Sequence, residues 1–222
     1  MKSVCIGDMK LEVPIIQGGM GVGISLGNLA GHVAKNGGMG VISTAHPGYR
    51  AEDFEKNPTE VNKRELAKEI QKAKEIAKGK GMVAINAMVA ITDYAQMVEV
   101  AIKNKIDAII SGAGLPMNLP GFVKGTKVKI APIVSSGKAA RLICKTWDRR
   151  YHVAPDFVVI EGSEAGGHLG FHKEDVLNKT TAKLADIFKE VKETLQPFVE
   201  KYQKEIPIFV AGGVYDADDI TQ

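Results

Sequence analysis

Short apolar runs alternate along this chain with longer amphipathic segments, and this alternation restricts the possible folds more than any other feature. Most of the apolar runs are continuous, which is typical of strands that are buried on both faces of a parallel sheet. The longer segments repeat apolar residues at three- and four-residue steps, which indicates amphipathic helices. The sequence therefore predicts an α/β fold built on a parallel sheet.

The same pattern gives the expected bounds of each element. The predicted strands are residues 13–17, 39–43, 82–88, 107–111, 128–134, 156–160 and 206–211. The predicted helices are residues 26–35, 60–78, 93–103, 138–150 and 183–203, the last with a kink or break at Pro197. Residues 112–127 are rich in glycine and proline, which predicts a loop with at most one short helix.

Strands that alternate with helices leave two architectures, a doubly wound open sheet and a (β/α)8 TIM barrel. A barrel needs eight strands, whereas the pattern provides seven, and residues 216–222 stand where the seventh helix is expected to begin. The sheet is therefore either open, or it is a barrel that lacks its last βα unit in this chain. No linker or change in composition divides the chain, so we expect a single domain over residues 1–222, C-terminally incomplete if it is a barrel.

The composition excludes several classes of protein. With 29 Lys and Arg against 26 Asp and Glu, the net charge is only +3, which argues against a nucleic-acid binder. No apolar stretch approaches the ~18 residues of a membrane span, and the first residues do not form a signal peptide. Cys5 and Cys144 are far apart, which indicates neither a disulfide framework nor a metal site. We therefore expect a cytoplasmic protein with no membrane partner.

Glycine-rich turns follow four of the predicted strands. They occupy residues 17–23, 112–114, 161–168 and 211–213, and Asn86 lies near the end of the third strand. The carboxyl ends of parallel strands meet at one edge of the sheet, where α/β proteins place their sites. One such turn is ordinary, but four at the same edge predict a ligand-binding site.

The glycines do not match the common nucleotide motifs. Gly19, Gly21 and Gly23 have the wrong spacing for a dinucleotide fingerprint, and no P-loop is present. The pairs Gly166–Gly167 and Gly212–Gly213 can instead expose backbone N–H groups to a phosphate.

His168 is the candidate for acid–base chemistry or anion binding, because it follows two glycines at a strand end and titrates in the neutral range. The alternative is a structural histidine paired with a carboxylate such as Glu164.

Six segments together resemble the nitronate monooxygenase family, formerly called 2-nitropropane dioxygenases, whose superfamily includes the FMN-dependent enoyl-acyl-carrier-protein reductases. The segments are Pro14-Ile15-Ile16-Gln17-Gly18-Gly19-Met20, Gly37-Gly38-Met39-Gly40-Val41-Ile42, Asn86-Ala87-Met88, Gly112-Ala113-Gly114, Glu164-Ala165-Gly166-Gly167-His168 and Ala211-Gly212-Gly213-Val214. They extend over nearly the whole chain in the order that the family has.

The resemblance implies a (β/α)8 barrel that binds FMN at its carboxyl-end loops, and it implies an eighth strand and turn that this chain lacks. The residues expected to border the flavin ring are Gly18, Gly19, Met20, Asn86, Gly112, Ala113 and Gly114. Those expected on the ribityl-phosphate side are Glu161, Gly166, Gly167, Gly212 and Gly213. His168 is expected to be the catalytic residue beside the substrate.

The implied function is FMN-dependent oxidation of alkyl nitronates by molecular oxygen. The alternative is an enoyl-acyl-carrier-protein reductase that uses NADH or NADPH, because Glu161 and Gly18-Gly19-Met20 are more similar to the reductase branch. A third possibility, a barrel subunit without activity, is opposed by His168 and the intact glycines. The partners expected are a nitronate or enoyl thioester and oxygen, and self-association stays open.

Overall fold

The computed structural model describes residues 2–221. The strands are β1 (Val4–Ile6), β2 (Met9–Leu11), β3 (Met39–Ser43), β4 (Met82–Met88), β5 (Ala108–Gly112), β6 (Lys129–Val134), β7 (Val158–Glu161) and β8 (Ile208–Ala211). The helices are α1 (Gly27–Lys35), α2 (Pro58–Ala77), α3 (Tyr94–Lys103), α4 (Leu119–Val123), α5 (Gly137–Tyr151), α6 (Lys173–Leu177), α7 (Leu184–Tyr202) and α8 (Ala217–Thr221).

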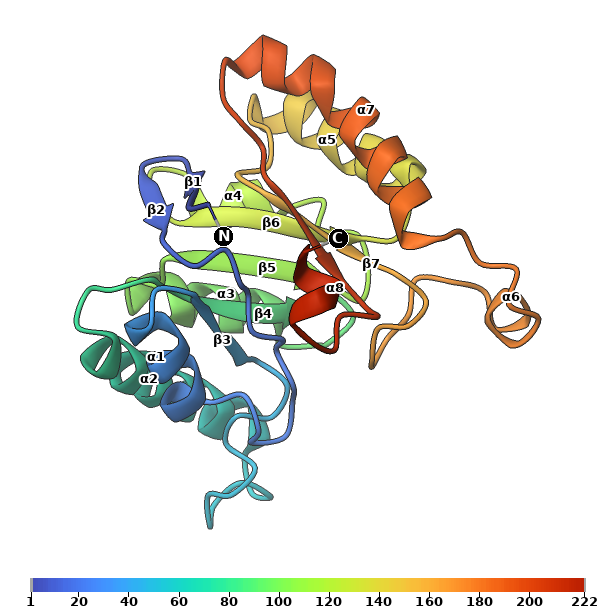
Figure 1. Ribbon diagram of the computed structural model, residues 1–222. Helices are drawn as coiled ribbons and strands as arrows, with labels where there is room; N and C mark the ends of the chain where they lie inside the picture. The colour runs from blue at the N-terminus through green and yellow to red at the C-terminus, as the bar shows by residue number, and fades with distance from the viewer. Residues whose placement is uncertain (1, 222) are drawn as a thin grey trace.

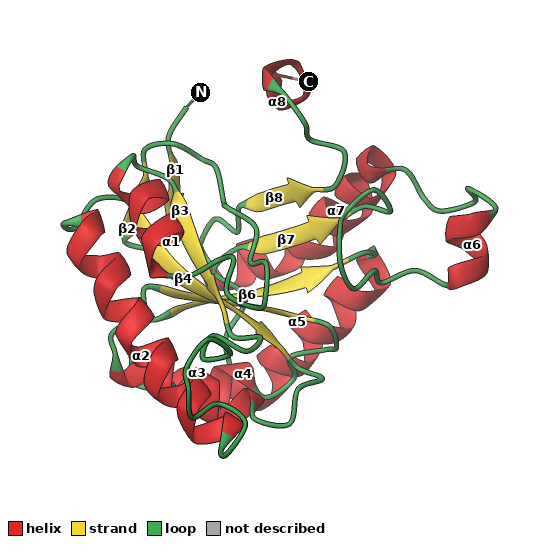
Figure 2. Cartoon of the chain, turned by 90° about the horizontal axis from the view of Figure 1, so that it is seen from below, coloured by secondary structure: helices red, strands yellow, loops and turns green. Residues whose placement is uncertain are grey.

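Six parallel strands form one sheet in the order β3-β4-β5-β6-β7-β8, so strands that follow one another in the sequence are also neighbours in the sheet (Figure 1). A doubly wound sheet reverses this order at a switch point, and no reversal occurs here. The sheet curls into a half-barrel with helices on its outer side (Figure 2). The α/β fold and the incomplete barrel are therefore confirmed, and the open doubly wound sheet is excluded.

The predicted first strand, residues 13–17, lies beside β3 but is not a regular strand. It forms one isolated parallel bridge, between Ile16 and Met39. The Gln17 N–H donates to the Met39 carbonyl over 3.0 Å. The ladder is interrupted because Pro14 has no N–H and the Ile15 N–H bonds to the Val13 carbonyl. Residues 13–17 thus occupy the position of a seventh strand with irregular backbone, which corrects the prediction.

The inner face of the half-barrel is apolar. Its fully or almost fully buried side chains are Ile6, Leu11, Met39, Val41, Met82, Ala84, Ala108, Ile110, Ala131 and Phe157. Two of them, Ile6 and Leu11, belong to the hairpin of β1 and β2, which the sequence pattern did not predict. The turn of this hairpin is held by an ion pair of 2.5 Å between Asp8 and Lys129, the first residue of β6. The hairpin therefore covers the amino-terminal end of the half-barrel.

The outer face of the sheet packs against the helices. A Cβ on Gly40 of β3 would lie 1.8 Å from the Ala30 carbonyl oxygen, so only glycine lets α1 approach the sheet this closely. Trp147 of α5 is fully buried, and its indole N–H donates to the Pro116 carbonyl over 3.0 Å. This bond fixes the loop after β5, where the predicted short helix is present as α4.

The sequence predicts a kink or break at Pro197; helix α7 continues through this residue, so a break does not occur and the kink stays a prediction. Its buried residues Ile187, Val191 and Leu195 face the core, and the helix packs against α5. Tertiary packing of an apolar face supplies most helix stability, and it offsets the hydrogen bond that proline cannot make.

The two edges of the sheet are residues 13–17 and β8. Ile15 at one edge is 39% exposed, and Val210 at the other is 44% exposed. Among residues 2–221, no helix has the length and apolar character needed to cross a membrane.

Candidate active site

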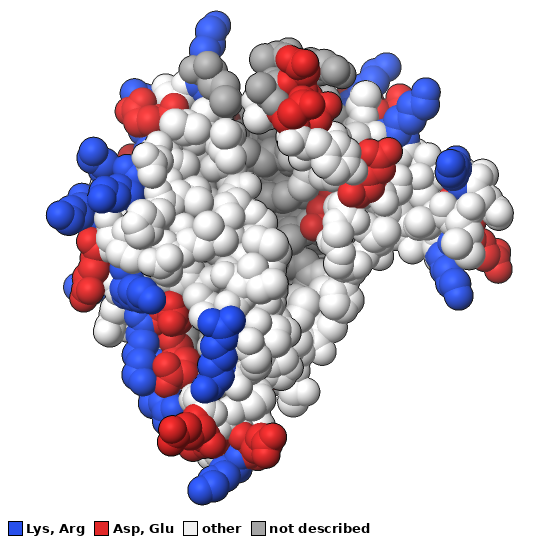
Figure 3. Space-filling view, turned by 60° about the horizontal axis from the view of Figure 1, so that its bottom comes forward, with Lys and Arg blue, Asp and Glu red and all other residues white. Residues whose placement is uncertain are grey.

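The inner face of the half-barrel changes from apolar to polar toward the carboxyl ends of its strands. Val41, Ile110 and Val159 line the deeper part of a cavity of about 730 Å³, and Gln17, Asn86 and Glu161 line it at the strand ends. Figure 3 shows a hollow on this side of the molecule, surrounded mainly by uncharged residues. An apolar cavity with a few converging polar groups is the usual form of a small-molecule site.

Five of the residues predicted from the sequence line this cavity. They are Gly18, Gly19, Asn86, Glu161 and Gly212. They come from the loop after residues 13–17, from β4, from β7 and from the turn after β8. The half-barrel therefore gathers residues that are almost 200 positions apart in the sequence.

The other predicted residues lie outside the cavity lining. They are Met20, Gly112, Ala113, Gly114, Gly166, Gly167, His168 and Gly213. Met20 is 46% exposed, and His168 is exposed in the loop after β7. The roles of these residues stay predictions.

Asn86 has an unsatisfied buried acceptor. Its side-chain N–H donates to the Gly19 carbonyl over 3.4 Å, whereas its Oδ1 is buried and has no hydrogen-bond partner among the described residues. A Cβ on Gly19 would lie 2.4 Å from the Asn86 Cβ, so the glycine backbone packs directly on this side chain. An unpaired buried acceptor costs about 1–3 kcal/mol, and Asn86 is one of the residues that line the cavity.

Glu161 is a half-buried carboxyl at the end of β7, on the cavity side. Burial raises the pKa of Glu161 above its ordinary value, and the positive charge of His168 acts in the opposite direction. His168 is therefore near enough to influence this carboxyl, although it does not line the cavity. A cavity carboxyl with a raised pKa can hold a proton under conditions in which an exposed one has lost it.

The turns after β7 and β8 pack against each other. The Gly162 N–H donates to the Ala211 carbonyl over 2.9 Å, and Gly212 has a φ of +93°. A Cβ on Gly212 would lie 2.7 Å from the Ala165 backbone nitrogen, so a larger residue would separate the two turns. A Cβ on Gly166 or Gly167 would have no atom within 4 Å other than those of its chain neighbours, so there is open space beside their backbone.

Sequence reasoning missed two residues that shape the first glycine-rich loop. Gln17 was noted only as part of a motif, and Ser25 was not noted. Ser25 is fully buried, and its hydroxyl lies 2.9 Å from the Gly18 carbonyl oxygen and 2.8 Å from the Gln17 side-chain nitrogen. In the sequence, a serine just before a predicted helix looks like a helix cap. No local pattern therefore shows that Ser25 instead bonds to the glycine-rich loop.

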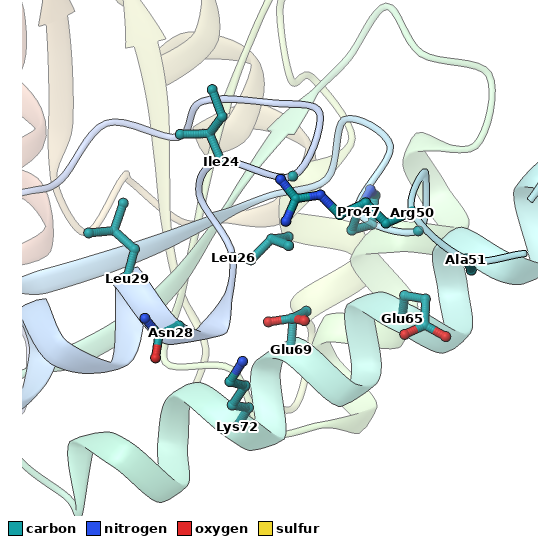
Figure 4. Close-up of a pocket in the computed structure, with 12 residues that line it drawn as sticks. Ile24, Leu26, Asn28, Leu29, Pro47, Arg50, Ala51, Glu65, Glu69 and Lys72 are labelled. Carbon is teal, nitrogen blue, oxygen red and sulfur yellow. The ribbon is translucent and has the colours of Figure 1, made fainter.

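A second cavity, of about 410 Å³, lies outside the half-barrel between the loop at Gly23–Leu26, α1 and α2 (Figure 4). Its lining mixes the cations Arg50 and Lys72 with the acids Glu65 and Glu69. None of the residues predicted for the site lines this cavity.

A family model for nitronate monooxygenase matches residues 2–222. The chain belongs to the nitronate monooxygenase family. This membership agrees with the site at the carboxyl ends of the strands and confirms the resemblance read from the sequence. No curated protein sequence matches the chain.

Two solved structures are similar to this family member over most of its length. FabK from Thermotoga maritima is 24% identical with a TM-score of 0.68, and the match covers 95% of this chain and 54% of FabK. A nitroalkane oxidase from Streptomyces ansochromogenes is 18% identical with a TM-score of 0.66, and the match covers 92% of this chain and 59% of the oxidase. These likenesses show a shared fold, and the chain spans little more than half the length of either protein.

Proposed function

We propose that this chain is the FMN-binding part of an oxidoreductase that oxidises alkyl nitronates with molecular oxygen. The observation that carries the proposal is the unpaired Oδ1 of Asn86, which is buried at a cavity lined by glycine-rich loops. Family membership supports the class of reaction.

The residues present fit a flavin mononucleotide. The cavity volume is within the ~300–1,000 Å³ of common ligand sites, and its lower wall is apolar, as a planar ring system requires. Asn86 offers an acceptor for a ring N–H, and Gly18, which has open space where a Cβ would lie, leaves room for a ring to approach its backbone. On the phosphate side, the open space at Gly166 and Gly167 and the glycine pair at 212–213 suit an anion that binds backbone N–H groups.

A bound flavin supplies the redox chemistry, and the protein supplies binding, orientation and proton control. His168 is assigned to the substrate, where it holds the nitro group or removes the α-proton of a neutral nitroalkane. Glu161, at the end of β7 just before that loop, places a carboxyl with a raised pKa on the cavity side, close enough for the charge of His168 to act on it. The apolar side chains below the mouth keep water away from the reacting atoms.

A second candidate is the reduction of an enoyl thioester by NADH or NADPH. The observation that favours it is Glu161 itself, because a carboxyl at this position together with Gly18-Gly19-Met20 is similar to the reductase branch of the superfamily. Both candidates use the same cavity and the same cofactor, so binding of FMN does not separate them.

Anaerobic reduction of the FMN-loaded chain separates the two activities. Bleaching of the flavin absorbance by an alkyl nitronate alone supports the oxidation, and bleaching by NADH or NADPH alone supports the reductase. A purified chain that stays colourless after incubation with FMN contradicts both proposals and favours a role in assembly.

A further inference from the structure

The Gly18 carbonyl, at the mouth of the cavity, is the acceptor of three hydrogen bonds. It accepts from the Ser25 hydroxyl over 2.9 Å, from the Gln17 side-chain amide, and from the Met20 N–H over 3.2 Å. The Ser25 oxygen itself accepts from the Met20 N–H over 2.9 Å. This peptide group is therefore held in one orientation by two side chains and its own loop.

The two side chains are in turn held by β3. The Gln17 amide pairs with both backbone groups of Val41, donating to its carbonyl over 3.1 Å and accepting from its N–H over 3.1 Å. The Ser25 carbonyl accepts from the Ser43 N–H over 2.9 Å. The orientation of the loop is thus set by the sheet rather than by the loop residues alone.

The orientation of this carbonyl determines where the next N–H points. In a planar trans peptide, the Gly18 C=O and the Gly19 N–H point in opposite directions. Since the carbonyl faces Ser25 and Gln17, the Gly19 N–H points away from them. In the described part of the chain, neither the Gly18 N–H nor the Gly19 N–H has a hydrogen-bond partner, and both glycines line the cavity.

We infer that Ser25 and Gln17 are positioning residues that present the Gly19 N–H as an oriented hydrogen-bond donor to the ring of the bound flavin. This inference rests on the proposed function. The Gly19 backbone packs on the side chain of Asn86, whose Oδ1 is unpaired, so the site offers a donor and an acceptor from two residues in contact. A donor that is oriented in advance favours the form of the ring with more negative charge, which is the reduced form.

The test is a redox titration of the FMN-loaded full chain with Ser25→Ala. Without the hydroxyl, the Gly18 carbonyl loses one of its three hydrogen bonds and the Gly18–Gly19 peptide is held less firmly. We expect the equilibrium constant for two-electron reduction of the bound flavin to fall about tenfold, which is about 30 mV. The visible spectrum of the bound flavin should shift as well, because the donor to the ring is no longer held. Gln17→Met keeps the length of the side chain but cannot donate, so it should also lower the reduction potential of the bound flavin. This variant replaces Ser25→Ala if Ser25→Ala does not fold.

Ser111→Ala is the matched control. Ser111 is also fully buried, and its hydroxyl bonds to the Ala87 carbonyl and the Tyr94 hydroxyl, both over 3.0 Å. We expect this variant to lose stability but to keep the wild-type potential. Equal shifts in Ser25→Ala and Ser111→Ala, or no shift in Ser25→Ala, would overturn the inference while leaving the proposed function intact. A wild-type chain that binds no FMN would overturn the proposed function, and the inference with it.

Discussion

The Glu69 carboxylate on α2 accepts a hydrogen bond of 2.7 Å from the backbone N–H of Gly27, the first residue of α1. The residue before the helix, Leu26, provides no side-chain cap, so Glu69, which is 42 positions after Gly27, caps the helix instead. A Cβ on Gly27 would lie 2.3 Å from the Glu69 carbonyl oxygen, which shows how closely the two helices pack. The cap therefore ties α1, which follows the first glycine-rich loop, to α2.

Replacing Glu69 with alanine should lower the free energy of unfolding by about 1 kcal/mol, the usual cost of a lost helix cap. The Gly27 N–H then loses its protein acceptor, and Gly27 itself is buried. Urea denaturation followed by circular dichroism measures the change. Glu69→Gln keeps an acceptor and should recover part of the stability, and an equal loss in both variants would contradict the capping role.

Replacing Asn86 with leucine should separate stability from ligand binding. The substitution removes a buried acceptor without a partner, so the ligand-free chain should lose little stability or gain up to about 1 kcal/mol. Binding of FMN should weaken by about tenfold or more, since the flavin then loses the acceptor that Asn86 provides. Thermal unfolding and fluorescence titration with FMN measure the two effects.

The control for that experiment is Asn62→Leu. Asn62 is also buried, but its Oδ1 accepts from the Gly48 N–H over 3.1 Å. This substitution should destabilise the chain and leave the affinity for FMN unchanged. If both leucine variants lose affinity equally, Asn86 has no specific role in binding.

Glu161→Gln should change how stability depends on pH. In the wild-type chain the raised pKa of Glu161 means that ionisation is harder in the folded state than in the unfolded state. The wild-type chain should therefore lose stability as the pH rises from 4.5, the ordinary pKa of a glutamate, through the raised pKa of Glu161. Glu161→Gln should not show this loss. Denaturant unfolding of both proteins at about pH 4 and about pH 8 measures this difference. An equal change in the free energy of unfolding between the two pH values in both proteins would refute the prediction.

His168→Ala should keep the fold, because the side chain is exposed and lies in a loop. If His168 removes the α-proton, activity on neutral nitroalkanes should fall by ~10²–10⁴, and activity on pre-formed nitronates should fall less. Steady-state rates on both substrates decide whether His168 removes the α-proton or only binds the anion. An equal loss on both leaves only anion binding for His168, and no loss on either removes it from the chemistry.

The sequence by itself determined the type of most elements. The strands 39–43 and 82–88 were predicted with the bounds that β3 and β4 have, because continuous apolar runs and amphipathic repeats are local patterns that survive any tertiary arrangement. The family also followed from short motifs at strand ends. The β1–β2 hairpin was missed because strands of three residues are too short to show a period.

Only the tertiary structure decided which of the predicted residues meet. Hydrogen bonding and burial depend on strand register and loop packing, which join positions that are distant in the sequence. The Gln17 amide pairs with Val41, and Ser25 reaches the Gly18 carbonyl, because residues 13–17 lie beside β3. Gly19 packs over the side chain of Asn86, whose Oδ1 has no partner, and no pattern of neighbouring residues contains this contact.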